Sequence, residues 1–251
     1  MGYGCRFQVT GLRIGLEQLL NLQPGICNSF RPPIILRTSM NISITKFVTG
    51  PLETNTYVVS KGQEPALVVD PSSGCDAITE FLKSKKLGIA AILLTHGHFD
   101  HLLGISEIQA FAPGAEVWVH PDDRPLLANP QFNGSFMIGR AFSYTGPVRT
   151  LSEGPLSVGA HSFEVLAMPG HSPGGVAFVF RDGGETACIS GDSLFAGSIG
   201  RSDFPGSDGD VLLRCIKEKL LTLPDETVVY PGHGGRTTIG RERRLNPYLA
   251  E

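Results

Sequence analysis

The chain has 251 residues, 41% of them hydrophobic, and a formal net charge of −3 at pH 7. That length suits one large α/β domain with a substantial buried core, and the slightly acidic balance makes nucleic acid a poor default partner. Because no run of about 18 apolar residues occurs, we expect no transmembrane helix and no membrane partner.

The first 39 residues differ in composition from the rest. They contain four arginines but only one acidic residue, a balance that weakly resembles an organelle transit peptide. Met40 directly precedes a clear strand pattern. We therefore expect residues 1–39 to be a leader or extension, largely disordered, and residues 40–251 to form the functional domain.

The five cysteines are scattered and include no C-x-x-C pair. A sparse, odd set in a chain of this length argues against a disulfide framework and favours a reducing compartment. We expect a cytoplasmic protein, or an organellar one if residues 1–39 are a transit peptide.

The first half of the domain alternates strands with helices. Hydrophobic periodicity and turn residues predict, in chain order, strands at 42–49, 55–60 and 66–71, a helix at 76–86, a strand at 89–94, a helix from about Leu102 to Phe111, and a strand at 116–120. The sequence GPLETN supplies the turn between the first two strands.

The second half continues in the same manner after a long irregular segment. Residues 129–150 have no clear period and are interpreted as a long loop, of the kind that forms lids or binding loops. The other elements are a short helix from Pro121, strands near 156–167, 175–181 and 186–190, a helix at 208–222, a strand at 227–230 and a helix near 238–245. This order fits two sheets packed face to face with helices outside, and it also fits a three-layer α/β/α sandwich.

The segment LLTHGHFDHLLG, residues 93–104, contains the strongest chemical signal. His96, His98, Asp100 and His101 fall within six residues, between a buried strand and a helix. Imidazole and carboxylate are suitable ligands for divalent zinc, iron or manganese. Burial of four such groups without a partner would be costly, so the cluster predicts a metal site. In an extended run His101 would point away from the others, which is consistent with two neighbouring ions.

Three later segments repeat one arrangement, a strand followed by a glycine-bearing turn and a metal-competent side chain. They are MPGHSPGG with His171, CISGDSLF with Asp192 and VVYPGHGG with His233. Together with the first cluster they supply five histidines and two aspartates. That number is enough for two metal sites with positions left open for substrate.

The series H-x-H-x-D-H, PGH, GD and PGH resembles the metallo-β-lactamase superfamily, and the resemblance runs from about Ile42 to Leu249. It implies an α/β fold, a four-layer αββα sandwich with the metals at one sheet edge. It also implies two divalent ions, with zinc the first expectation and iron or manganese alternatives. The implied ligands are His96, His98 and His171 for one ion, Asp100, His101 and His233 for the other, and Asp192 as the bridge.

Asp192 narrows the resemblance, because true β-lactamases of this fold typically have cysteine or serine there. The segments GSIGRSDFPGSD, 197–208, and TTIGRERRLNPYL, 237–249, are similar to compact glyoxalase II-like bacterial hydrolases. The C-terminal helical domain that supplies much of the glutathione site in full glyoxalase II has no counterpart in the sequence. The resemblance thus implies a hydrolase of thioesters such as S-lactoylglutathione, with glutathione itself left open.

The implied mechanism places the chemistry on the metals and on two carboxylates. A hydroxide bridging the ions would attack the thioester or ester carbonyl of a small-molecule substrate. Asp192 would hold both ions, and Asp100 would also orient the proton of the hydroxide. Ser172 and Ser193 lie beside ligands, but no separate base is evident for either, so neither is expected to be the nucleophile.

Three further polar residues are candidates for supporting roles. Asp70, at a strand end, is expected to support a ligand or cap a turn rather than bind metal. Arg201 and Asp203 are expected to form an ion pair that supports their loop, with contact between Arg201 and a substrate carboxylate as the alternative. The apolar side chains of the 129–150 segment either line a substrate pocket or pack against the sheet; they are Phe132, Phe136, Met137 and Phe142.

Other activities remain open from the sequence. A mononuclear iron persulfide dioxygenase has a similar motif series and would use His96, His171 and Asp192. A lactonase, β-lactamase or phosphodiesterase would use the same ligands with different loops. A scaffold without activity would be expected to lack some of the ligands, and none is missing.

Overall fold

The computed structural model describes residues 34–35 and 41–249. Apart from Ile34 and Ile35, the predicted leader lies outside the described residues, so its disorder and the domain boundary at residue 40 stay predictions. Every helix in the described part of the chain falls short of the length and apolarity needed to cross a bilayer.

The first sheet has seven strands within the described residues, in the spatial order β1-β2-β3-β4-β5-β6-β7. They are β1 (Ile34–Ile35), β2 (Ile42–Thr49), β3 (Thr54–Lys61), β4 (Ala66–Val69), β5 (Ile89–Leu93), β6 (Glu116–Val119) and β7 (Val148–Thr150). Pairing is antiparallel from β1 to β4 and parallel from β4 to β7. The carboxyl ends of β4 and β5 therefore meet at one edge, where Asp70 and His96 follow.

The second sheet has six strands within the same residues, in the order β15-β14-β11-β10-β9-β8. They are β8 (Gly154–Val158), β9 (His161–Ala167), β10 (Val176–Asp182), β11 (Glu185–Gly191), β14 (Val228–Pro231) and β15 (Thr237–Thr238). β11 and β14 run parallel, and the other pairs are antiparallel. The parallel pair brings the segments after Gly191 and Pro231 to the same edge. A separate hairpin joins β12 (Leu194–Phe195) to β13 (Ser198–Ile199).

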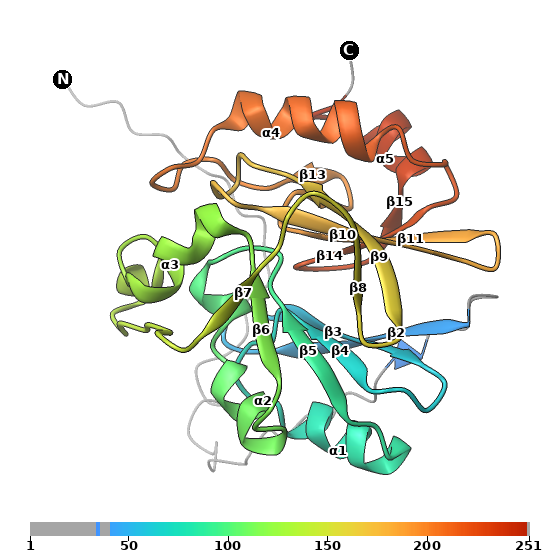
Figure 1. Cartoon of the computed structure of the whole chain (residues 1–251). Coiled ribbons are helices and arrows are strands. Elements are labelled where there is room, and N and C mark those ends of the chain that lie inside the picture. The colour runs from blue at the N-terminus through green and yellow to red at the C-terminus, as the bar shows by residue number, and fades with distance from the viewer. Residues whose placement is uncertain (1–33, 36–40, 250–251) are drawn as a thin grey trace, which may run out of the picture. The chain divides into compact units, whose positions relative to one another are not determined.

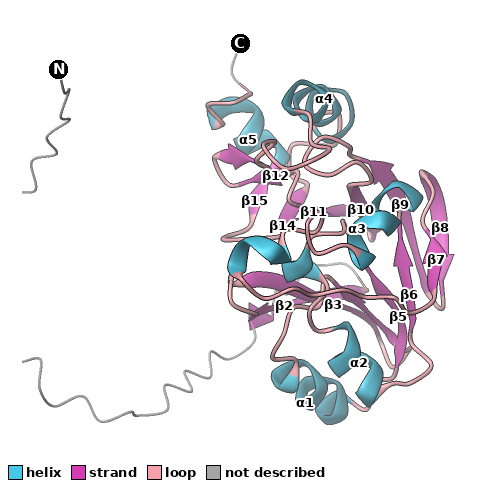
Figure 2. Ribbon diagram, turned by 90° about the vertical axis from the view of Figure 1, so that its left-hand side faces the viewer, coloured by secondary structure: helices cyan, strands magenta, loops and turns pink. Residues whose placement is uncertain are grey.

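Helices cover the outer face of each sheet, so the fold is the four-layer αββα sandwich (Figure 1). α1 (Asp76–Lys85) and α2 (Ile105–Phe111) lie below the first sheet, while α4 (Gly209–Cys215), the π-helical turn η5 (Ile216–Leu220) and α5 (Ile239–Leu245) lie above the second. Figure 2 shows the two sheets in edge view between these helix layers. The expected fold class is confirmed, and the three-layer alternative is excluded.

Three apolar clusters separate the four layers. The central one lies between the sheets and includes Tyr57 and Phe178, whereas the outer two contain Ile78 on one side and Leu212 on the other. Apolar residues on both faces of the buried strands explain why their sequences are almost continuously hydrophobic. The Tyr57 hydroxyl also donates a hydrogen bond to the Pro231 carbonyl at 2.6 Å, which ties β3 to the end of β14.

Several predicted boundaries were wrong. The segment 156–167 is the hairpin β8–β9 rather than one strand, because Gly159 turns the chain with φ of 57°. The interpreted loop 129–150 contains the 3₁₀ helix η4 (Ser135–Ile138) and edge strand β7. The helix expected from Leu102 begins only at Ile105, after a 3₁₀ turn η2 (Phe99–His101). The short strands β12, β13 and β15 had no periodic signal, since two residues cannot show a period.

The inter-sheet core predicts a large difference between two phenylalanine truncations. Phe178 is fully buried, so Phe178→Ala should lower the free energy of unfolding by about 3–5 kcal/mol, through lost burial and the cavity left behind. The control Phe136→Ala removes a ring that is 66% exposed and should change it by less than about 0.5 kcal/mol. Urea unfolding of both variants measures this, and equal losses would contradict the assignment of Phe178 to the core.

Candidate metal centre

The seven residues expected to bind metal come together at one edge of the sandwich. His96 and His98 follow β5, and Asp100 and His101 lie on the 3₁₀ helix η2 (Phe99–His101) that continues this loop. The remaining three follow strands of the second sheet: His171 after β9, Asp192 after β11 and His233 after β14. Strand ends fix the backbone at this edge, and the glycine-containing turns then direct the side chains inward.

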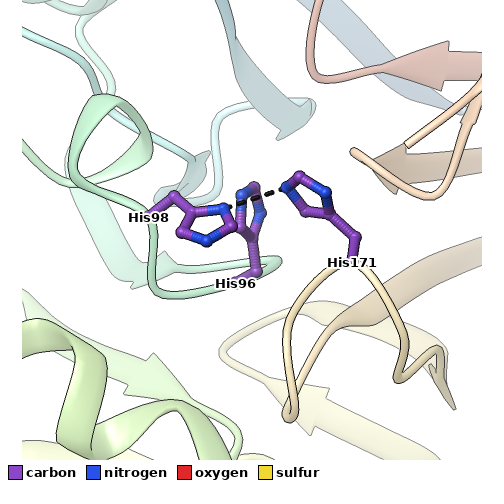
Figure 3. A group of neighbouring side chains, drawn as sticks. All are labelled: His96, His98 and His171. Atoms are coloured by element: carbon purple, nitrogen blue, oxygen red, sulfur yellow. Dashed lines mark hydrogen bonds between the residues drawn. The ribbon is translucent and has the colours of Figure 1, made fainter. Parts of the chain in front are cut away.

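The first ligand group consists of His96, His98 and His171, whose candidate ligand atoms lie within 4.8 Å of one another. The three imidazoles converge from two separate loops (Figure 3). His98 Nδ1 lies 2.9 Å from His171 Nε2, and the ring of His96 is centred 4.8 Å from that of His98. All three side chains are buried.

The second group consists of Asp100, His101 and His233. Asp100 Oδ2 lies 3.3 Å from His101 Nε2 and 3.2 Å from His233 Nε2. Thr54 Oγ1 donates a hydrogen bond to the same Asp100 oxygen at 3.0 Å, which helps to fix the carboxylate. Thr54 was not expected from the sequence, because a threonine that begins a strand carries no distinctive signal.

Asp192 lies between the two groups. Its Oδ2 is 3.6 Å from His171 Nε2 in the first group and 3.6 Å from His233 Nε2 in the second, and its Oδ1 is 3.4 Å from His101 Nε2. One carboxylate therefore faces both groups, as a bridging ligand would.

Three polar atoms that face the centre make no hydrogen bond within the described part of the chain. His96 Nε2, His101 Nε2 and Asp192 Oδ1 are buried without a hydrogen bond, at a cost of about 1–3 kcal/mol for each such group. The 3.2–3.6 Å separations across the second group and Asp192 match the roughly 3.4 Å expected between ligands held about 2.1 Å from a tetrahedral ion. These atoms fit two divalent cations, and the His and Asp donor set suits zinc, iron and manganese alike.

The outer nitrogens of His171 and His233 are held by hydrogen bonds, which orient the inner nitrogens of the same rings. His171 Nδ1 donates to the Arg201 carbonyl at 2.7 Å, and His233 Nδ1 donates to the Leu52 carbonyl at 3.1 Å. A proton on Nδ1 leaves the Nε2 lone pair free to bind a cation. Arg201 thus supports a candidate ligand through its backbone rather than its side chain.

Asp70 supports the centre from outside. It sits at φ of 51°, accepts hydrogen bonds from the Thr95 amide and hydroxyl, and accepts one from His101 Nδ1 at 3.0 Å. Asp70, His96 and His101 also form a third cluster close enough for a metal. Because the carboxylate faces the outer nitrogen of His101 and is already occupied by Thr95, the geometry favours the supporting role over ligation.

Burial and neighbouring charges shift the pKa values of the residues in the cluster in different directions. Burial, reinforced by nearby histidines, lowers the pKa of His96 and His98 well below the usual value. Burial would lower the pKa of His101 as well, but the carboxylates around it outweigh that effect and raise its pKa to about 10. Burial acts to raise the pKa of Asp100, yet His101 and His233 hold it below its usual range.

A cleft of about 470 Å³ opens over the two groups, within the range of small-molecule sites. Its walls include Leu52, Met137, Ile138, Phe195 and Phe204.

The aromatic and apolar side chains of segment 129–150 lie in different environments. Met137 lines the cleft and is 67% exposed, while Phe142 packs against the outer core under the first sheet. Phe132 and Phe136 remain exposed. The pocket interpretation therefore holds for Met137 and the packing interpretation for Phe142, whereas neither holds for Phe132 or Phe136.

Arg201 and Asp203 form the ion pair expected from the sequence. Two hydrogen bonds of 2.6 and 2.7 Å join the guanidinium to the carboxylate, and the guanidinium stacks on the Phe204 ring at 4.3 Å. Arg201 lines the cleft, so the pair lies at its rim. His120 and His161 lie outside both ligand groups.

Both the sequence and the fold of this chain are similar to those of known proteins. Residues 49–233 match the sequence profile of the metallo-beta-lactamase superfamily. The hydroxyacylglutathione hydrolase GloC of Haemophilus influenzae is 31% identical over 84% of this chain and 98% of its own length. Two solved structures are similar: BLEG-1 B3 metallo-beta-lactamase (38% identity, TM-score 0.77, 83% of this chain and 100% of that one) and TTHA1623 in a di-iron-bound form (40%, 0.72, 81% and 99%).

Gly232 gives a direct test of the bridging carboxylate. A Cβ at this position would lie 2.1 Å from Asp192 Oδ1 and 2.7 Å from His101 Cε1, so Gly232→Ala must disturb both of these contacts. We expect metal affinity to fall by at least about tenfold, as for other changes that misorient ligands. Gly235→Ala is the matched control, because its Cβ would meet nothing within 4 Å. Metal content after dialysis against a chelator measures both, and equal retention would contradict this placement of Asp192.

The raised pKa of His101 predicts that metal binding releases a proton. With a pKa of about 10, His101 is protonated in the metal-free protein at pH 8, and a cation can bind Nε2 only after that proton leaves. Affinity should therefore rise with pH, by about tenfold per unit for each proton displaced, and level off above pH 10. Calorimetric zinc titration in buffers of different ionisation enthalpy should give at least one proton released at pH 8, whereas none would contradict the assignment.

Proposed function

Because the chain belongs to the metallo-β-lactamase superfamily and is a metal-dependent hydrolase, we propose that it hydrolyses thioesters, with S-lactoylglutathione as the first substrate to test. The observation that carries this proposal is the position of Asp192 between two complete ligand groups at the floor of an open cleft. The relative described as a hydroxyacylglutathione hydrolase supports the choice of substrate class.

The two ions, when bound, would supply a water of lowered pKa and a positive field for the developing oxyanion. His96, His98 and His171 would hold one ion, Asp100, His101 and His233 the other, and Asp192 both. Asp100 lines the cleft, where its carboxylate can orient the proton of the attacking water. The neutral states of His96 and His98 suit them to be ligands rather than proton donors.

A serine nucleophile is not needed in this scheme. The Ser172 hydroxyl donates a 2.7 Å hydrogen bond to the buried carboxylate of Asp123, so it is committed to a structural contact. Among the described residues, no histidine or carboxylate is hydrogen-bonded to the Ser193 hydroxyl, and the Ser193 backbone amide donates to the Ser190 carbonyl. Attack by water is therefore the better-supported route.

The cleft walls bear on which thioester fits. Exposed apolar side chains such as Leu52 and Met137 can pack against the acyl or thiol substituents. Among the described residues that line the cleft, Arg201 is the one permanent cation, and Asp203 already pairs with it. A glutathione carboxylate would have to compete with Asp203, so the acyl group and the thioester itself are the part of the substrate that we propose the site selects.

A second candidate is β-lactam hydrolysis, favoured by the 38% identity to the BLEG-1 structure. The same water could attack a strained amide carbonyl. Asp192 occupies the position at which true β-lactamases of this fold typically have cysteine or serine, and its carboxylate faces both ligand groups. This difference from the β-lactamases argues for the thioester as substrate. The alternative of a one-iron persulfide dioxygenase is tested in the same experiment.

The test begins with protein purified without added metal. We expect about two metal ions per chain, hydrolysis of S-lactoylglutathione, and a fall in kcat/KM of more than about 100-fold in His96→Ala, beyond the 10–100-fold typical of outer supporting groups. His161→Ala is the control, since this buried histidine contacts the Pro65 carbonyl away from the ligand groups. Nitrocefin turnover and glutathione persulfide-dependent oxygen uptake are measured in parallel.

The possible outcomes separate the candidates. A single iron with oxygen uptake and no thioester cleavage would reject the proposal in favour of the dioxygenase. Faster nitrocefin than thioester turnover would favour the β-lactamase reading. Retained thioester turnover in His96→Ala would reject the assigned metal centre.

A further inference from the structure

Asp123 is a buried carboxylate outside both ligand groups. It lies at the end of η3 (Pro121–Asp123), directly before α3 (Arg124–Ala128), and its side chain has no solvent exposure. Three donors meet it: the Gly97 amide at 2.8 Å and the Ser172 hydroxyl at 2.7 Å on Oδ2, and the Gly174 amide at 2.6 Å on Oδ1. Hydrogen bonds to an ionised acceptor are short and strong, as these are.

The donors come from the two loops that carry the first ligand group. Gly97 lies between His96 and His98, and Ser172 directly follows His171. One carboxylate thus fastens the loop after β5 to the loop after β9, which belong to different sheets. None of its three contacts involves the segments of Asp192 or His233.

The backbone at both loops is shaped for this contact. A Cβ on Gly174 would lie 2.6 Å from the Asp123 amide nitrogen, and one on Gly97 would lie 2.8 Å from Leu126 Cβ and 3.0 Å from the Asp123 carbonyl oxygen. Only glycine lets the two loops approach the start of α3 this closely. Asp123 and its three donors, which we call the Asp123 clamp, therefore join three segments of the chain whose backbones are shaped for close contact.

Burial also makes the carboxylate dependent on its donors. Burial raises the pKa of Asp123, and the hydrogen bonds from Ser172, Gly174 and Gly97 act in the opposite direction. Protonation would place an O–H against groups that are all donors. The contact is complete only when the carboxylate is ionised and all three donors are in place.

We propose that Asp123 is a positioning residue for one ion of the centre: it sets the separation of the His96–His98 loop from the His171 loop and so the affinity of the three-histidine group alone. The second group has its own support, since Asp70 bonds His101 and the Leu52 carbonyl bonds His233. The two ions are then held by separate supports that meet at Asp192. This inference rests on the proposed two-ion centre.

Asp123→Asn tests it with little change in volume. The amide keeps one oxygen acceptor but turns an NH₂ donor toward at least one of the three donors. We expect one equivalent of Zn²⁺ to bind about 10–100-fold more weakly while the other is unchanged. Competition with a chromophoric chelator gives both affinities. Asp122→Asn is the matched control, because the neighbouring side chain is 64% exposed.

Cobalt absorption identifies which equivalent has changed. His98→Ala removes a ligand of the first group, so its Co²⁺ spectrum shows the bands of the second group alone. His233→Ala removes a ligand of the second group, so its spectrum shows the bands of the first group alone. In Asp123→Asn, the bands that His98→Ala removes should appear only at higher Co²⁺ concentration. Equal weakening of both equivalents, or no weakening of either, would overturn the proposal.

Ser172→Ala keeps the test decisive if Asp123→Asn does not fold. It removes one donor and leaves the carboxylate and both amides, so the same equivalent should weaken by less than in Asp123→Asn, and unchanged affinity would overturn the proposal. Wild-type protein that binds only one equivalent would instead contradict the two-ion function. In that case, loss of the single equivalent in His98→Ala together with weaker binding in Ser172→Ala would still support the positioning role of Asp123, and any other result would overturn it.

Discussion

The constraint on which the site depends is the burial of several ionisable groups whose free atoms face one another. Five histidines and two aspartates converge, and three of their inward atoms, His96 Nε2, His101 Nε2 and Asp192 Oδ1, make no hydrogen bond to any described residue. Packing alone would not favour this arrangement, because each unpaired buried polar atom opposes folding. Two cations would resolve the cost, and every outer hydrogen bond then has a purpose: it selects the tautomer that leaves the inner lone pair free.

The two sheets make this convergence possible. Parallel pairing of β4 with β5, and of β11 with β14, brings the carboxyl ends of four strands to one edge, and each is followed directly by a residue of the centre or its support. Neither sheet supplies a complete set of groups by itself. The inter-sheet core around Tyr57 and Phe178, with the Tyr57–Pro231 hydrogen bond, therefore holds the two parts of the site at a fixed separation.

The seven candidate ligands and most of the strands could be predicted from the sequence, because ligand spacing and strand periodicity are local signals. His96 to His101 lie in one loop, and His171, Asp192 and His233 each follow an apolar strand, so the candidates could be identified without knowing the fold. Asp123 and Thr54 could not, since their importance comes from contacts with segments 26 to 51 positions away. Asp123 lies within PDDR, where nothing distinguishes it from its exposed neighbour Asp122. The role of Arg201 through its carbonyl was equally hidden, because the sequence displays the guanidinium and not the direction of the backbone.

The floor and the walls of the cleft differ in how firmly they are held. The floor carries the candidate metal ligands, whereas the walls would contact the rest of the substrate. The floor consists of ligand side chains that are buried or, at Asp192 and His233, half-buried, and they are held by Asp70, Asp123 and strand ends. The β12–β13 hairpin, which carries Phe195 and Ile199, is anchored from behind, since Glu242 accepts the Gly197 amide and Asn246 donates to the Ser198 carbonyl.

Another wall of the cleft, around Met137 and Ile138, is a short 3₁₀ helix between Gly134 and Gly139 with exposed apolar side chains. Substitutions there would leave the metal ligands and their supports in place, because none of those hydrogen bonds reaches residues 135–138. A superfamily that keeps one centre and changes its substrates would be expected to vary such a wall, and in this chain the wall is apolar. Whatever group the substrate places against it gains from burial rather than from charge, whereas in the proposed reaction the carbonyl would have to reach the floor between the two ligand groups.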